Sequence, residues 1–266
     1  MTSPPDAIFH LDGDRVVPTE LARGPWSPDA QHGGAPAALL ARTVERHEPG
    51  PADFVARMTI ELLRPVPLAP LTVRSRTIRP GKKVQLVEAS LFDGDDVEVV
   101  RATALRVRTA DLALPVPEPA PLDIPPHDKS SAFKIRFDPD VELPLGFWKA
   151  VELRQARGSW TESGDATVWF RLQVAVVAGE APSPFQRVAA AADFGNGISA
   201  ALERGKYLFI NPDLTIYLHR LPAGEWVALD ARTYAEAGGI GVAESALYDE
   251  EGRIGRSVQA LLIDRL

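Results

Sequence analysis

The sequence contains no cysteine among its 266 residues. This absence excludes disulfides, thiolate metal sites, iron–sulfur clusters and enzymes with a cysteine nucleophile, and it fits a reducing cytoplasm. Basic residues are also in deficit, because 29 Lys and Arg against 36 Asp and Glu give a formal net charge of −7. Nucleic-acid binding needs a positive face, so we expect no nucleic-acid partner.

Long apolar stretches are absent too. No segment approaches the roughly 20 apolar residues that cross a bilayer, and the first residues, MTSPPDAIFHLDGD, lack the basic and apolar regions of a signal peptide. With 45% hydrophobic and 24% charged residues the composition is that of an ordinary globular protein. We therefore expect a cytoplasmic protein that neither enters a membrane nor is exported.

Several motifs of enzyme chemistry are missing. There is no GxSxG segment, so the nucleophilic serine of an α/β-hydrolase is not supported. The five histidines have no metal-ligand spacing, so no metal site is expected. The glycines at 238–241 are typical of a turn and not of a phosphate-binding loop, and we expect no bound cofactor.

A proline-rich segment divides the chain in two. Six prolines between 110 and 126 predict an extended connector, so we divide the chain into an N-terminal domain at 1–110, a linker at 111–134 and a C-terminal domain at 135–266. Each half shows a helix followed by strands. We expect helices at 37–46 and 185–203, and strands at 57–62, 71–76, 84–91 and 97–107, then 214–218, 226–232, 242–248 and 258–263.

The two halves match each other at a constant offset of 156 residues. Thr59 and Thr215 correspond, since 215 − 59 = 156, and the same offset relates Arg76 to Arg232. Further pairs at this offset are Leu62 with Leu218, Glu88 with Glu244, Leu91 with Leu247 and Asp93 with Asp249. Such gap-free agreement over about 35 residues predicts a tandem duplication.

Short motifs in a fixed order connect the chain to a known family. They are His32-Gly33-Gly34 followed by an Ala/Leu-rich helix to 46, Val151-Glu152-Leu153-Arg154, Val168-Trp169-Phe170-Arg171, Ala191-Ala192-Asp193, Leu218-His219-Arg220 with Glu225-Trp226, and Gly255-Arg256-Ser257-Val258-Gln259. In this order and spacing the chain resembles the acyl-CoA thioesterases of the thioesterase II (TesB-like) double-hotdog family. The resemblance implies an α+β fold, in which two tandem helix-plus-antiparallel-sheet repeats form one continuous sheet, and a homodimer or higher homo-oligomer.

Asp193 is the most informative acid. It ends an otherwise apolar run in the second expected helix, where a buried carboxylate is costly unless it is hydrogen-bonded or used. From the residues alone it could instead lie on an exposed stripe or cap a helix that breaks at Gly195. The resemblance implies that Asp193 is the catalytic carboxylate. At the same offset the N-terminal half has Ala37, which suggests one active site and a degenerate twin.

The resemblance implies two further polar partners. Gln259 matches the family's glutamine, and its counterpart in the N-terminal half is Ala104. The family's Thr or Ser falls at Asn211, nine residues before the Arg of the His-Arg pair, so this chain departs from the hydroxyl pattern. Thr215 shares a strand face with Asn211 and could supply the hydroxyl, although we rank Asn211 first.

Glycines and basic residues complete the candidates. Gly33 and Gly34 at a helix start could offer backbone N–H groups to an oxyanion, or they could simply form a turn. Next to them, His32 is read as a structural hydrogen-bonding residue in preference to a base. Gly195 and Gly197 could kink the helix or admit the acyl chain or pantetheine arm.

A basic run that includes Arg79, Lys82 and Lys83 could meet the phosphates of coenzyme A, although such hairpins are usually just solvated. The sequence thus predicts an acyl-CoA thioesterase in which Asp193 activates water, or attacks as a nucleophile, with acyl-CoA as the substrate. The alternatives are a non-catalytic acyl-binding hotdog protein and a hotdog enoyl-CoA hydratase. The hydratase is disfavoured because no histidine lies near Asp193 in the sequence.

Overall fold

The computed structural model describes residues 5–117, 122–133, 135 and 143–266. Before the Pro-rich segment the strands are β1 (Ala7–Asp12), β2 (Arg15–Pro18), β3 (Phe54–Leu62), β4 (Leu71–Arg79), β5 (Val84–Phe92) and β6 (Glu98–Val107). After it they are β7 (Ser131–Ala132), β8 (Val151–Arg157), β9 (Ala166–Leu172), β10 (Ala175–Val177), β11 (Tyr207–Ile210), β12 (Asp213–Leu218), β13 (Trp226–Glu236), β14 (Ile240–Asp249) and β15 (Gly252–Arg265). The helices are α1 (Gly34–Arg46), α2 (Phe147–Ala150), α3 (Pro184–Ala192) and α4 (Gly195–Ile198), with 3-10 turns η1 (Glu20–Ala22) and η2 (His127–Lys129).

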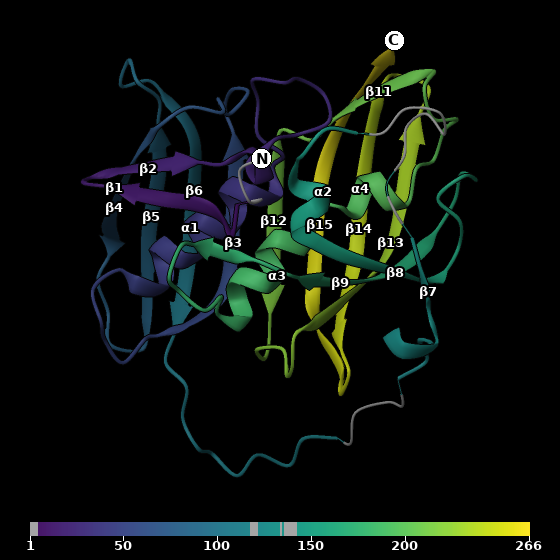
Figure 1. Ribbon diagram of the computed structural model, residues 1–266. Coiled ribbons are helices and arrows are strands. Elements are labelled where there is room, and N and C mark those ends of the chain that lie inside the picture. The colour runs from purple at the N-terminus through teal and green to yellow at the C-terminus, as the bar shows by residue number, and fades with distance from the viewer. Residues whose placement is uncertain (1–4, 118–121, 134, 136–142) are drawn as a thin grey trace.

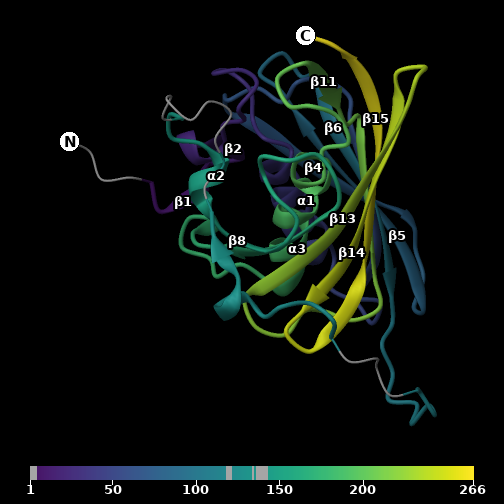
Figure 2. The same ribbon diagram turned by 90° about the vertical axis from the view of Figure 1, so that its right-hand side faces the viewer.

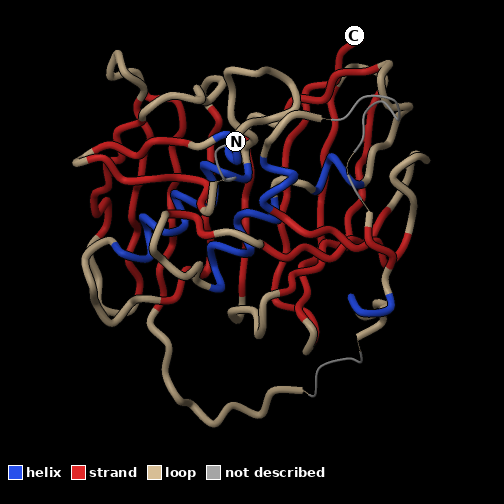
Figure 3. The backbone as a smooth tube through the Cα atoms, in the orientation of Figure 1, coloured by secondary structure: helices blue, strands red, loops and turns tan. Residues whose placement is uncertain are grey.

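The strands form one continuous sheet, which has 15 strands within the described residues. Its order is β10-β1-β2-β4-β5-β6-β3-β12-β15-β14-β13-β9-β8-β7, with β11 beside β15. The order β2-β4-β5-β6-β3 of one half is repeated in reverse as β12-β15-β14-β13-β9 in the other (Figure 1). The sheet curves around α1 and α3, and the helices lie on one side of it (Figures 2 and 3). The expected double-hotdog architecture is therefore confirmed.

The two halves meet where β3 pairs with β12. Thr59 lies directly opposite Thr215, and their hydroxyl oxygens are 3.2 Å apart. Because these two residues are counterparts at the 156-residue offset, a local two-fold axis passes between them. The strand pairing inside each half follows the same offset, since Arg76 lies opposite Glu88 and Arg232 lies opposite Glu244. The tandem duplication is confirmed by this register.

The helix predictions had different outcomes. The first helix is present and starts earlier than expected, at Gly34, with Pro36 in its first turn, where proline's missing N–H costs nothing. The prediction of one helix over 185–203 is wrong. α3 ends at Ala192, where Phe194 N–H bonds to the carbonyl of Ala191, three residues back, and tightens the last turn. Only the short α4 follows.

The eight strands expected from alternating patterns are present with slightly shifted ends. Strands β1, β2, β7, β8, β9, β10 and β11 were not predicted. The first of these, β1, pairs in parallel with β10 of the other half, so the sheet also joins the halves at its edge. The division at 1–110, 111–134 and 135–266 stays a prediction, and residues 118–121 and 134 of the expected linker lie outside the described residues.

The end of the Pro-rich segment packs on the sheet face opposite the helices. Ile124 is buried there with Trp169 and Trp226, and the Trp169 indole N–H donates to the carbonyl of Pro125 at 2.8 Å. The His127 ring stacks on Trp226 at 4.6 Å between centroids. This part of the connector is therefore held against the C-terminal half.

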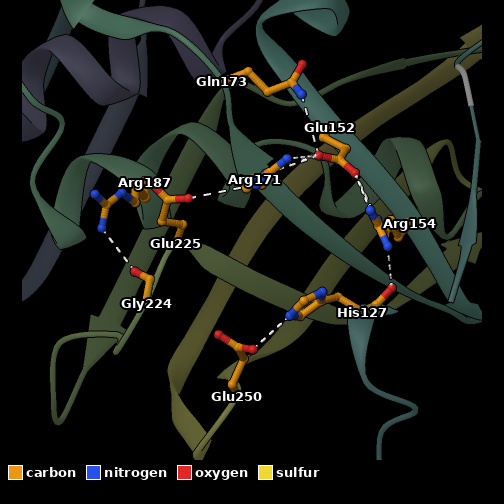
Figure 4. Close-up of polar contacts among 9 residues, drawn as sticks. All are labelled: His127, Glu152, Arg154, Arg171, Gln173, Arg187, Gly224, Glu225 and Glu250. Atoms are coloured by element: carbon orange, nitrogen blue, oxygen red, sulfur yellow. Dashed lines mark hydrogen bonds and ion pairs between the residues drawn. The ribbon is translucent and has the colours of Figure 1, made fainter. Parts of the chain in front are cut away.

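A charged network surrounds this contact (Figure 4). Glu152 accepts hydrogen bonds from Arg154 at 2.8 Å and from Arg171 at 3.0 Å. Arg154 also donates to the carbonyl of His127, whose Nε2 lies 2.7 Å from a carboxylate oxygen of Glu250. The family-like segments around 151–154, 168–171 and 225–226 thus contribute to this network, which fastens the connector to the sheet.

The β14–β15 hairpin contains a buried carboxylate, Asp249, that pairs with Arg220 from the loop after β12. Asp249 is fully buried and accepts hydrogen bonds from Arg220 at 2.6 Å and from the N–H groups of Ala223, Glu251 and Gly252 at 2.7 to 3.0 Å. Burial by itself would raise the pKa of Asp249, but these hydrogen bonds and the Arg220 charge outweigh it and hold the pKa below its usual value.

We expect Asp249→Asn to destabilise the fold by about 2 kcal/mol at pH 7, less than a fully buried pair because Arg220 is 32% exposed. A carboxylate with a depressed pKa stabilises the fold above its unfolded pKa and loses that effect as the pH falls through the folded pKa. The difference between wild type and variant in urea unfolding should therefore shrink toward pH 3. Asp93→Asn, at the counterpart position, is the control, because that carboxylate bonds only backbone N–H groups in the described part of the chain. Equal losses in both variants would contradict the prediction.

Within the described residues, no helix is long and apolar enough to cross a membrane.

Candidate active site

The break after α3 places Asp193 at the centre of a polar cluster. Its side chain is only 7% exposed. Oδ1 accepts a hydrogen bond from Nδ2 of Asn211 at 2.8 Å and a longer one from Nε2 of Gln259 at 3.3 Å. Oδ2 lies 3.1 Å from Nδ1 of His32, and no N–H or O–H of the other described residues donates to it. The two carboxylate oxygens are therefore in different environments.

Gln259 is held in one orientation. Its side chain is buried on β15, and Oε1 accepts the backbone N–H of Asn196 in α4 at 3.2 Å. An amide whose oxygen is occupied in this way must turn its NH₂ group toward Asp193. Gln259 lies opposite Ala243 on β14, just as Ala104 lies opposite Val87 on β5. Ala104 is thus its counterpart, and the polar residue occurs in one half only.

Gly33 allows the start of α1 to approach the carboxylate. A Cβ on Gly33 would lie 2.7 and 2.8 Å from the two carboxylate oxygens of Asp193. A Cβ on Gly34 would lie 2.6 Å from the Phe147 ring and 2.7 Å from the carbonyl of Ala190. Since any side chain at these positions would push the two helices apart, the glycine pair is required for the close approach. The site therefore combines residues from both halves of the chain.

The backbone N–H groups of Gly33 and Gly34 differ in whether they already have a hydrogen-bond acceptor. Gly34 N–H donates to Nδ1 of His32 at 3.0 Å, so the expected oxyanion donor is already occupied. Gly33 N–H has no acceptor within the described part of the chain. It precedes α1, whose N-terminus carries a positive partial charge. Of the two groups, Gly33 N–H is the one available to a ligand.

His32 is a site residue that the sequence analysis treated as structural. Its ring forms a three-ring cluster with Phe147, at 4.9 Å between centroids, and Phe194, at 4.6 Å. Burial lowers the pKa of His32, and the Asp193 carboxylate opposes this only in part, so the imidazole is neutral at neutral pH. The signal that could have found it is its place directly before the two glycines. Its contact with Asp193 is visible only in the fold.

Thr215, Gly195 and Gly197 lie in three different surroundings. The Thr215 hydroxyl faces Thr59 at the junction of the halves, and among the described residues it makes no hydrogen bond to Asp193. A Cβ on Gly195 would lie 2.9 Å from Oγ of Ser245 and 3.1 Å from Oε1 of Gln259, so the missing side chain lets α4 rest on the sheet beside the cluster. Gly197 faces open space, since a Cβ there would meet nothing within 4 Å.

The basic run is at a distant hairpin. Arg79 ends β4, and Lys82 and Lys83 lie in the turn before β5. Gln259 lies opposite Ala243, near the matching hairpin between β13 and β14. Hairpins related by the two-fold axis are at opposite ends of the sheet, so the basic run does not join the cluster around the carboxylate. No group of three or more metal-ligating side chains occurs within the described residues.

Family comparisons cover most of the chain. The family model of the acyl-CoA thioesterase N-terminal domain matches residues 22–107, and that of the acyl-CoA thioesterase C-terminal domain matches residues 118–263. Comparison with curated proteins gives no match.

Solved structures share the fold at low sequence identity. A hot dog fold protein of unknown function from Alicyclobacillus acidocaldarius is 18% identical with a TM-score of 0.75, and 97% of each chain is covered. A candidate thioesterase II from Thermobifida fusca YX is 16% identical with a TM-score of 0.72, covering 98% of this chain and 96% of that one. The acyl-CoA thioesterase II TesB2 from Mycobacterium marinum is 15% identical with a TM-score of 0.66, covering 96% and 95%. At these identities the similarity establishes the fold.

Proposed function

Since this chain belongs to the acyl-CoA thioesterase family, we propose that Asp193 is the general base that activates water for hydrolysis of the thioester. The protein is a thioester hydrolase, and its substrate class is acyl-CoA. The observation that carries the proposal is the pair of amide donors on one oxygen of the Asp193 carboxylate. They hold the group in one orientation, and they leave the other oxygen to take a proton.

The reaction follows from these positions. A water held by the amides of Asn211 and Gln259 attacks the thioester carbon and gives its proton to Oδ2 of Asp193. The charge that develops on the carbonyl oxygen is received by Gly33 N–H, aided by the positive end of α1. When the intermediate collapses, the C–S bond breaks and the proton passes from Asp193 to the thiolate. The products are a carboxylic acid and free coenzyme A.

Asn211 takes the place of the hydroxyl expected from the family resemblance. An amide can donate to Asp193 through one N–H and still hold water through its second N–H or its oxygen. We therefore assign the role to Asn211 and not to Thr215, which faces away toward Thr59.

We expect Asn211→Ala to lower kcat by about tenfold or more, because one donor to the base and one water contact are lost. Thr215→Ala should leave kcat within about twofold, because its hydroxyl contacts only Thr59 among the described side chains. Steady-state kinetics on the two variants separates the candidates. A larger loss in Thr215→Ala would reverse the assignment.

The activity itself is tested by release of free thiol from acyl-CoAs of different chain length. Turnover that depends on Asp193 is expected. Stoichiometric binding of acyl-CoA without thiol release would instead favour the acyl-binding alternative. A single turnover in H₂¹⁸O separates the general base from a nucleophilic carboxylate. Direct attack by water labels the product acid alone, whereas an anhydride intermediate can transfer the label to Asp193.

A further inference from the structure

The Nδ1 atom of His32 lies within hydrogen-bond distance of two groups but can bond to only one of them at a time. It lies 3.0 Å from the N–H of Gly34 and 3.1 Å from Oδ2 of Asp193. An unprotonated imidazole nitrogen has a single in-plane lone pair, so it accepts one strong hydrogen bond. The Gly34 N–H is directed at Nδ1, which requires that Nδ1 carries no proton and that the hydrogen is on Nε2.

This tautomer leaves two electron-rich atoms facing each other. Nδ1 presents a lone pair to the carboxylate oxygen Oδ2 of Asp193 at 3.1 Å, a contact that is favourable only when a proton lies between the two atoms. Oδ1 is less able to take this proton, because it already accepts hydrogen bonds from Asn211 and Gln259. Oδ2 is therefore the oxygen to be protonated, and the proton would then point to Nδ1.

The His32 ring has little freedom to turn. It packs against Phe147 and Phe194, whose ring centroids lie 5.8 Å from each other, and its side chain is 14% exposed. Because the ring is held in this way, Nδ1 can change its hydrogen-bond partner only if a proton moves. Because a neutral imidazole is stable here, Nδ1 is free to act as an acceptor throughout.

On the basis of the proposed function, we propose that His32 is a positioning residue whose Nδ1 exchanges Gly34 N–H for the protonated Oδ2 of Asp193 during hydrolysis. In the resting enzyme Nδ1 accepts from Gly34. When water attacks, its oxygen bonds to the thioester carbon and its proton moves to Oδ2, which then donates to Nδ1. Gly34 N–H is released and joins Gly33 N–H on the developing oxyanion. Collapse of the intermediate breaks the C–S bond, returns the proton from Oδ2 to the thiolate, and restores the bond to Gly34.

This exchange would add two interactions in the transition state that are absent in the ground state. One stabilises the protonated base and the other stabilises the oxyanion, and only interactions of this kind raise kcat. Binding of the substrate should be affected little, because neither bond forms before water attacks.

The test is His32→Phe, which keeps an aromatic ring against Phe147 and Phe194 and removes Nδ1. We expect kcat to fall about 10- to 100-fold with KM nearly unchanged. His10→Phe is the matched control, since that histidine is exposed on β1. In an Asp193→Asn background the further loss from His32→Phe should be small, because the proton that Nδ1 accepts is gone. An unchanged kcat in folded His32→Phe, or an equal loss in both backgrounds, would overturn the proposal.

A second measurement does not depend on activity. The ¹⁵N spectrum of histidine-labelled protein, with the His32 signals identified by their loss in His32→Phe, reports which ring nitrogen carries the proton. At neutral pH we expect an unprotonated Nδ1 and a protonated Nε2. A protonated Nδ1 in the resting enzyme would refute the exchange, even if Asp193 proves to be the base. Full activity in Asp193→Asn would instead refute the proposed function.

Discussion

Replacing Asp193 by asparagine is expected to lower kcat for acyl-CoA hydrolysis by about 10²–10⁴-fold while the protein stays folded. The amide has almost the same shape as the carboxylate but cannot take a proton from water at neutral pH. Its oxygen can still accept from Asn211, so the local packing should persist. The measurement is thiol release under saturating substrate, together with thermal unfolding of both proteins.

The matched control is Asp165→Asn. That carboxylate is half exposed and pairs with Arg232 on the surface, so the same chemical change should leave kcat unaltered. If Asp193→Asn turns over acyl-CoA at the wild-type rate and unfolds at the wild-type temperature, the general-base assignment is wrong. A loss of activity that accompanies a large fall in Tm would point to a structural role for the carboxylate.

Gly33→Ala is expected to lower kcat by about 100-fold, the second largest effect in the site. The backbone of Gly33 has φ −57° and ψ −26°, which alanine adopts without strain. The added methyl group would nevertheless lie 2.7 and 2.8 Å from the two oxygens of Asp193. The carboxylate must move by several tenths of an ångström, away from its donors and from the thioester. Steady-state kinetics and a structure of the variant check both parts of this prediction.

Gly94→Ala provides the control for glycine replacement in general. A Cβ at Gly94 meets nothing within 4 Å, so kcat and Tm should both remain near wild type. Should Gly33→Ala retain full kcat, then the carboxylate has more freedom than its contacts indicate, and the close approach of α1 to the base is not needed for the reaction.

The composite nature of the site explains why the N-terminal half is needed although it has lost its own acid. His32 and Gly33 come from that half, while Asp193, Asn211 and Gln259 come from the other. The two-fold relation that pairs Thr59 with Thr215 also brings the N-terminus of α1 to the C-terminus of α3. Duplication therefore produced two potential sites, of which the one with Ala37 and Ala104 lacks the base and the amide.

Local patterns in the sequence determined most of the elements and their repetition. Alternation of apolar and polar residues marked the eight central strands, and the 156-residue offset related the halves, because duplicated elements keep their side-chain pattern. Signals of this kind are short-range, so they failed for β1, β8 and β10, whose strand character depends on neighbours distant in the chain. They also failed at the second helix, where apolar composition continued past Asp193.

Tertiary structure alone decided which polar groups meet. The sequence by itself could rank Asn211 before Thr215 only by family resemblance, because it predicted both on one strand face, whereas Asn211 lies between β11 and β12. In the fold, the two-fold axis directs Thr215 to Thr59, and β11 delivers Asn211 to the carboxylate. The sequence could not place His32 beside Asp193 for a similar reason, since the two residues are 161 positions apart, and the distance of 3.1 Å between Nδ1 and Oδ2 results from the packing of α1 against α3.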